Sequence, residues 1–215
     1  GLDESAQIDG TATLSVKGVL GEYGIILRNK EFMRYTLGFA VAMSALFAYI
    51  TGSSFIFLGY YGLGEHAFGV IFGINALGMT LVSALNAKLV QNREPAALLN
   101  FGLIAMLVMS LILLACAMLG LSFICFEASL FVLLSSLGFV APNATTLAMA
   151  LYKDGNSGAA SAVLGTAQFA IAGAISFIVG AVGANKPFLL ASVMAICALC
   201  ANAVYFLLRE KNQKF

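Results

Sequence analysis

The sequence predicts an all-α membrane protein with six transmembrane helices. Hydrophobic residues make up 61% of the 215 residues and charged residues only 10%, whereas a soluble globular domain is typically about 25% charged. Six apolar stretches are each long enough to cross a hydrocarbon core of roughly 30 Å, which takes about 20 helical residues. When these stretches are threaded as alternating passes, ten of the eleven lysine and arginine residues fall on one side.

The six stretches cover residues 35–58, 67–87, 96–119, 121–151, 158–184 and 187–208. Short connections between them predict antiparallel neighbours. Basic residues precede the first stretch, follow the second and fourth, and come after the last, whereas only Lys186 falls on the opposite side. Basic residues in short loops stay cytoplasmic, so we expect both termini of this chain in the cytoplasm.

The first thirty residues are the most polar part of the chain. Residues 1–13 have the composition of a linker, and apolar residues then recur at helical spacing over 16–27. This pattern predicts a weak amphipathic helix at the cytoplasmic headgroups, with a regulatory switch helix as the alternative. The chain begins at Gly1 and shows no signal peptide. We therefore expect a fragment that starts inside a cytoplasmic loop of a longer protein.

Several classes of function are disfavoured. The basic residues are spread over four loops and form no patch for nucleic acid. The single histidine, His66, lies next to Glu65 in a predicted loop, and no two carboxylates share a span. We find no arrangement of catalytic residues and no cofactor motif, so the sequence does not predict an enzyme.

Polar residues are unevenly shared among the spans. The first, second, fourth and fifth carry most of them: Tyr49, Thr51, Ser53, Ser54, Asn75, Thr80, Ser83, Glu127, Ser135, Ser136, Asn143, Ser161, Thr166 and Gln168. The third and sixth carry little beyond Asn100, Ser110, Ser192 and Asn202. Intramembrane polar groups generally face a bundle interior or water. We expect four spans to line a cavity and two to be peripheral, which suits a 3+3 repeat.

Two spans carry further signals. Pro142 removes a backbone donor from the fourth span and predicts a bend there, with Asn143 available to satisfy freed backbone groups or to reach a neighbouring helix. Small residues recur every four positions in the fifth span and allow close helix packing. They form two sets: Ala162, Thr166, Ala170 and Ala174, and Ala172, Ser176, Gly180 and Ala184.

Glu127 is the one ionisable residue well inside a span, about 9 Å from its outer end at 1.5 Å per residue. An intramembrane carboxylate indicates a functional site by default. Glu127 either binds a cationic substrate or a proton inside the bundle, or reaches outward into water and has no such role.

Five other residues, Tyr49, Phe55, Asn75, Asn143 and Gln168, are candidates for a substrate-binding site. Asn75 and Gln168 lie near the midpoints of the second and fifth spans, and either line a cavity or make structural hydrogen bonds between helices. Tyr49 and Phe55 are placed to face inward from the first span, where they either offer apolar area to a ligand or simply pack.

Four separated segments resemble a known family. They are YITGSSFIF at 49–57, FGVIFGINALGM at 68–79, GFVAPNATTLAM at 138–149 and SGAASAVLGTAQF at 157–169. In order and spacing they resemble the carboxy-terminal half of Bcr/CflA-type drug-resistance transporters of the major facilitator superfamily. Ser54 departs from the pattern, because a proline usually follows the Gly-Ser pair, and Glu127 is not part of that pattern.

The resemblance implies a twelve-span drug/proton antiporter of the bacterial inner membrane, of which this chain is spans seven to twelve. Residues 1–33 would be the central cytoplasmic loop, 34–208 the six-helix lobe and 209–215 a cytoplasmic tail. The implied partners are a drug-like substrate, protons, the lipid bilayer and the missing amino-terminal half. A natural-metabolite exporter and a non-transporting scaffold subunit are the alternatives.

Overall fold

A computed structural model describes residues 16–152, 156–183 and 186–209, and every regular element in these ranges is helical. The elements are α1 (Val16–Arg28), α2 (Lys30–Ser54), the π-helix η1 (Phe55–Tyr60), α3 (Glu65–Leu89), α4 (Pro95–Met118), α5 (Phe123–Ala150), α6 (Ser157–Val182) and α7 (Pro187–Leu207). Within the described ranges, six helices are long and apolar enough to span a membrane. The predicted all-α fold with six spans is confirmed.

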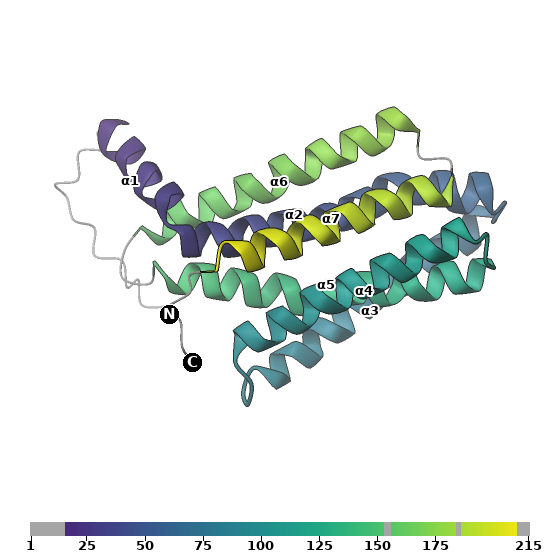
Figure 1. The fold of residues 1–215 in the computed structure, drawn as a ribbon, viewed down its shortest axis with the longest axis horizontal. Coiled ribbons are helices and arrows are strands. Elements are labelled where there is room, and N and C mark those ends of the chain that lie inside the picture. Colours follow the sequence, from purple (N-terminus) through teal and green to yellow (C-terminus); the bar gives the residue numbers. More distant parts are fainter. Residues whose placement is uncertain (1–15, 153–155, 184–185, 210–215) are drawn as a thin grey trace, which may run out of the picture.

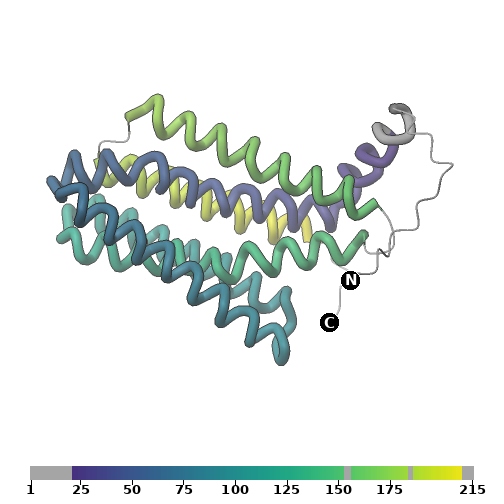
Figure 2. Tube along the Cα trace, turned by 180° about the vertical axis from the view of Figure 1, so that it is seen from behind, coloured from purple at the N-terminus to yellow at the C-terminus, as the bar shows by residue number. Residues whose placement is uncertain are grey.

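The helices α2 and α5 form the centre of the bundle (Figures 1 and 2). They pack against each other; α2 also packs on α6 and α7, and α5 on α3 and α4. A further contact between α4 and α7 closes a four-helix group of α2, α4, α5 and α7. The remaining two spans, α3 and α6, flank this group.

The two ends of the bundle differ chemically. At one end, Arg34, Glu94 and Arg209 line the same cavity, although they come from the start of α2, the loop before α4 and the end of α7. We call this the basic end. At the other end, which we call the aromatic end, Phe57, Tyr61 and Phe123 stack edge to face with centroids 5.0–5.7 Å apart. The alternating passes predicted from the sequence are therefore observed.

The first span ends in a feature that the sequence pattern did not predict. After Ser54 the backbone continues as the π-helix η1, so the span runs from Lys30 to Tyr60 without a break. Within η1, Ile56 and Phe57 are buried, whereas Phe55 and Tyr60 are exposed. Because a π-helix has a wider turn than an α-helix, these side chains point in different directions than they would on a regular α-helix.

Two glycines allow α3 and α5 to cross closely. A Cβ atom at Gly138 would lie 2.7 Å from the backbone nitrogen of Ser83 and 2.8 Å from the carbonyl oxygen of Met79. One at Gly78 would lie 2.5 Å from the side chains of Phe131 and Ser135. Any larger residue at Gly138 must push the two backbones apart.

Pro142 lies inside α5, which is continuous from Phe123 to Ala150. The Asn143 side chain donates 2.8 Å to the Phe139 carbonyl one turn earlier and 2.6 Å to Asn86 Oδ1 on α3. The prediction that Asn143 reaches a neighbouring helix is confirmed. The bend at Pro142 remains a prediction.

One of the two small-residue sets on α6 faces α2. Ala172 is fully buried, Ser176 and Thr51 share a hydrogen bond through their hydroxyls, and a Cβ at Gly180 would lie 3.7 Å from the Thr51 methyl group. The other set, represented by Ala162, Thr166 and Ala170, is exposed. Small residues alone therefore did not distinguish the packed face from the open one.

The pattern of exposure refines the prediction about peripheral spans. As expected, α4 and α7 make no extensive contacts with α3 or α6 in the described part of the chain. However, α3 and α6 are the least covered spans, with 11% and 22% of their most apolar stretch buried, against 61% for α5. The third and sixth spans, α4 and α7, thus stay apart from α3 and α6, but they pack against the central polar helices α5 and α2 and are not the most exposed spans.

The predicted amphipathic helix is present as α1, which packs against α6 and α2 and lies oblique to the bundle (Figures 1 and 2). Ile26 is buried, whereas Ile25 and Leu27 are exposed. The linker 1–13 and most of the tail 209–215 lie outside the described residues.

Candidate functional site

A polar cluster joins three helices inside the bundle. The Asn75 amide on α3 donates 2.7 Å to Glu127 Oε1 on α5 and 3.2 Å to the Tyr49 hydroxyl on α2. Three residues that the sequence singled out separately, from spans one, two and four, therefore meet at one place. We call Tyr49, Asn75 and Glu127 the polar cluster.

Local packing fixes the geometry of the cluster. The Tyr49 ring stacks on Phe72 with centroids 5.3 Å apart and planes inclined by 17°. Phe57 packs edge to face on Tyr49 and on Phe68. Asn75 lies three residues before Gly78, where the absence of a side chain lets α3 approach α5. As a result Tyr49 is 2% and Asn75 1% exposed.

The Glu127 carboxylate points into the bundle and not into water beyond the helix end. It sits in the second turn of α5, one oxygen accepts from Asn75, and the other, Oε2, is buried without a partner. Asn75 Oδ1 is also buried without a partner.

The two unpaired acceptors, Asn75 Oδ1 and Glu127 Oε2, define the chemistry of the cluster. Burying a carboxylate without a counter-charge is costly in a low-dielectric interior. A proton on Glu127, or a cationic group bound next to it, removes that cost. The cluster can therefore bind a cation or hold a proton.

The other three predicted site residues lie apart from the cluster. Phe55 is 43% exposed in η1. Gln168 is half-buried on α6. Asn143 lies sixteen residues after Glu127 on α5, about 24 Å away along the helix.

Asn143 belongs to a second polar contact, with Asn86, that sequence reasoning missed. Both side chains are buried, and they line a cavity of about 280 Å³ together with Ser83, Pro142 and Thr146. A larger cavity of about 550 Å³ runs along the same α3–α5 seam past Thr80 and Ser83. Asn86 follows Asn75 by eleven residues, or three helical turns, so both lie on one face of α3. This three-turn spacing of two asparagines was the signal in the sequence that could have identified Asn86.

The described residues contain no group of three His, Cys, Asp or Glu side chains that could hold a metal ion. The four cysteines are free thiols.

The fold defines a multi-pass membrane protein built as one six-helix bundle. No protein-family model matches the chain. Two curated relatives align with nearly all of it. An uncharacterised MFS-type transporter, YdgK of Bacillus subtilis (strain 168), is 25% identical over 98% of the chain. A bicyclomycin resistance protein homolog of Haemophilus influenzae is 22% identical over 99% of the chain.

These relatives confirm the resemblance to the major facilitator superfamily, and the six helices fit one lobe of that fold. The matches cover 52% and 53% of the relatives, so the chain spans about half the length of the proteins it resembles.

Proposed function

We propose that this chain is the carboxy-terminal lobe of a secondary transporter that exports drugs or similar small molecules across the bacterial inner membrane in exchange for protons. The buried, incompletely paired Glu127 carboxylate in the polar cluster carries the proposal. The name of the Haemophilus influenzae relative, a bicyclomycin resistance protein homolog, supports drug export.

The orientation follows from the basic end. Arg34, Lys88, Arg93 and Arg209 belong to segments at this end, and Lys186 begins the helix that starts at the other. By the positive-inside rule the basic end faces the cytoplasm. Both termini of the chain then lie inside.

The least covered helices, α3 and α6, support a place for an amino-terminal half. Exposed faces of α3 and α6 carry Ile74, Leu77, Leu81 and Phe169. In this proposal they face the other six-helix half across a central cavity. Rocking of the two halves then opens the cavity to each side of the membrane in turn.

Glu127 is the exchange site in this lobe. A protonated Glu127 needs no counter-charge, and an ionised one attracts the ammonium group of a cationic drug. Binding of the proton and of the drug is therefore mutually exclusive, which is the requirement for antiport. Asn75 and Tyr49 hold the carboxyl in place, while Phe55, Gln168 and Asn143 line the substrate path above and below it.

The decisive experiment replaces Glu127 by Gln in the whole transporter, which removes the charge and keeps the size. We expect resistance to cationic drugs to fall at least tenfold while resistance to neutral drugs changes little. Glu65→Gln, at an exposed carboxylate on the aromatic end, is the matched control and should leave both unchanged. Equal loss for both drug classes would overturn the direct binding of cationic drugs by Glu127.

A second measurement separates transport from the scaffold and metabolite alternatives. A single cysteine at Leu77, on the exposed face of α3, with Cys116, Cys125, Cys197 and Cys200 replaced by Ala, should react with a membrane-impermeant thiol reagent, because a transporter hydrates its cavity. A scaffold has no such cavity, so an inert cysteine would favour it. A metabolite exporter would show the hydrated cavity without drug resistance.

A further inference from the structure

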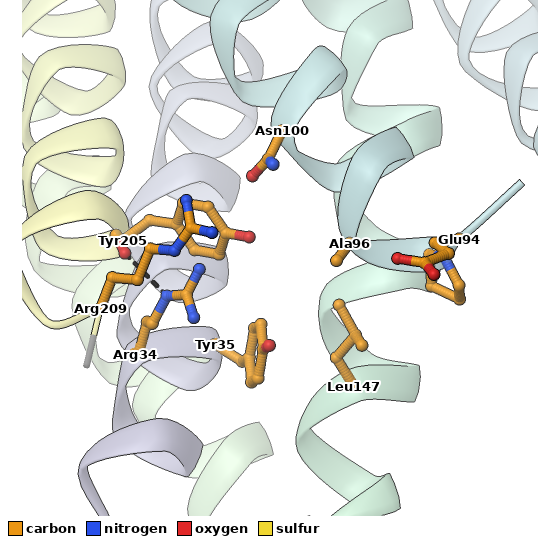
Figure 3. Close-up of a pocket in the computed structure, with 9 residues that line it drawn as sticks. Arg34, Tyr35, Glu94, Ala96, Asn100, Leu147, Tyr205 and Arg209 are labelled. Carbon is orange, nitrogen blue, oxygen red and sulfur yellow. Dashed lines mark hydrogen bonds between the residues drawn. The ribbon is translucent and has the colours of Figure 1, made fainter. Parts of the chain in front are cut away.

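A further cavity lies at the basic end, far from the polar cluster (Figure 3). It has a volume of about 220 Å³ and sits between α2, α4, α5 and α7. Its polar lining comes from Arg34, Glu94, Asn100, Tyr205 and Arg209, together with Tyr35. A single water takes up about 30 Å³ of liquid, so the cavity can hold a polyatomic ion.

Arg34 forms a rigid, positively charged wall of the cavity. It is 3% exposed, donates 2.8 Å from Nε to the Tyr205 carbonyl and pairs through Nη1 with Glu31 Oε1 at 2.9 Å. Its guanidinium carbon lies 4.1 Å from the centre of the Tyr205 ring and 5.1 Å from that of Tyr35. Arg209 brings a second guanidinium to the same cavity.

Two buried polar atoms in the cavity lack a partner. Tyr205 is 1% exposed and its hydroxyl makes no hydrogen bond, and Asn100 Oδ1 is likewise buried and unpaired. Both side chains point into the gap between the α2–α7 and α4–α5 pairs (Figure 3). Because burying a polar group without a hydrogen-bond partner is unfavourable, these groups indicate a missing ligand.

The start of α4 adds an electropositive feature. Helix α4 begins with Pro95, and no side chain caps its amino terminus. The dipole of α4 favours an anion at this end of the helix. Glu94, directly before Pro95, lies on the same side of the cavity and suits a positively charged group on the ligand.

We propose that this cavity binds a phosphate group, held by Arg209, the Tyr205 hydroxyl and the dipole at the start of α4, with the Asn100 amide nitrogen donating a further hydrogen bond. The phosphate belongs either to a phospholipid headgroup of the adjacent leaflet or to a soluble phosphate ester. This site goes beyond the proposed transport function, since it shares no residue with the polar cluster.

The test uses the purified, delipidated whole transporter and three probes: inorganic phosphate, dioctanoyl phosphatidic acid, and dioctanoylglycerol as the control without phosphate. Binding is measured by calorimetry and by the ligand-induced rise in melting temperature. We expect at least one phosphate-bearing probe to bind and dioctanoylglycerol not to bind. Binding of inorganic phosphate identifies a soluble source, and binding of the lipid alone identifies the membrane.

Two variants assign the binding to this cavity. Tyr205→Phe and Arg209→Gln should each weaken phosphate binding about tenfold, the effect of losing one hydrogen bond to a charged group. Tyr205→Phe also removes an unpaired buried hydroxyl, so the unliganded protein should be at least as stable as wild type, which keeps this variant informative if Arg209→Gln misfolds. Arg28→Gln, an exposed arginine outside the cavity, should bind normally. The proposal would be overturned if neither phosphate probe bound, or if Arg28→Gln weakened phosphate binding as much as the two cavity variants do.

Discussion

The Asn143 amide nitrogen on α5 lies 2.6 Å from Asn86 Oδ1 on α3, and both side chains are buried. This bond and the Asn75–Glu127 bond fasten the same helix pair at two levels, with the close approach at Gly78 and Gly138 between them. A hydrogen bond between membrane helices contributes about 0.6 kcal/mol on average and up to about 1.7 kcal/mol.

We predict that Asn86 and Asn143 are energetically coupled. In a double-mutant cycle with Asn86→Ala and Asn143→Ala, the loss of unfolding free energy in the double variant should be smaller than the sum of the two single losses by about 0.6–1.7 kcal/mol. Unfolding of the whole transporter in mixed micelles provides the measurement. Strictly additive losses would show that the bond contributes nothing, and Asn92→Ala in the exposed loop after α3 serves as the control.

Gly138→Ala should destabilise the transporter by about 1–3 kcal/mol, the usual cost of overpacking. The new methyl group would meet backbone atoms at 2.7 and 2.8 Å, and backbone cannot rotate away. Gly158→Ala, where no atom lies within 4 Å of the new Cβ, should be neutral or stabilising by up to about 1 kcal/mol because alanine favours a helix more than glycine. If thermal denaturation gave the two variants the same stability, the close crossing of α3 and α5 would be wrong.

At Tyr49 the ring should matter more than the hydroxyl. Tyr49→Phe removes one hydrogen bond, so we expect a loss of about 0.5–1.5 kcal/mol. Tyr49→Ala removes a buried ring stacked on Phe72 and should cost about 3–5 kcal/mol. Thermal denaturation of both variants tests this ranking. Tyr60→Ala, at a 55% exposed ring, should have a much smaller effect than Tyr49→Ala.

The orientation can be tested with reporter fusions. A reporter joined after Phe215 should be active only in its cytoplasmic form, because ten of eleven basic residues lie at that side. A fusion after Gly64, in the connection between η1 and α3, should be active only outside. The reverse pattern would invert the topology and place the phosphate-binding cavity on the outer face.

Much of the fold was predictable because membrane helices must be long, apolar and separated by short loops. The spans and the amphipathic helix α1 were expected close to their observed limits. The π-helix η1 was not, since the sequence 55–60 contains no residue that requires a wider turn. Nor did composition distinguish the packed set with Ala172 from the exposed set with Ala170 on α6, because both contain only small residues.

The candidate site was predictable residue by residue but not as a cluster. Tyr49, Asn75 and Glu127 each stood out as polar groups in apolar spans, and only the packing of three helices brings them together. Asn86 was overlooked because it lies close to the end of its helix, where polar residues are ordinary. Arg34 was counted only as a topological signal, since nothing in the sequence indicates that Tyr205 would bury it.

The Arg34–Tyr205 bond has a consequence for how the protein is made. These residues are 171 positions apart in the chain, and a ribosome adds roughly 5–20 residues per second. The first span therefore resides in the membrane for roughly 10–30 seconds before α7 exists to cover its arginine. During that interval Glu31, one turn before Arg34, is the counter-charge already within reach. A variant without Glu31 should consequently be lost during synthesis and insertion, before the finished bundle has any stability to measure.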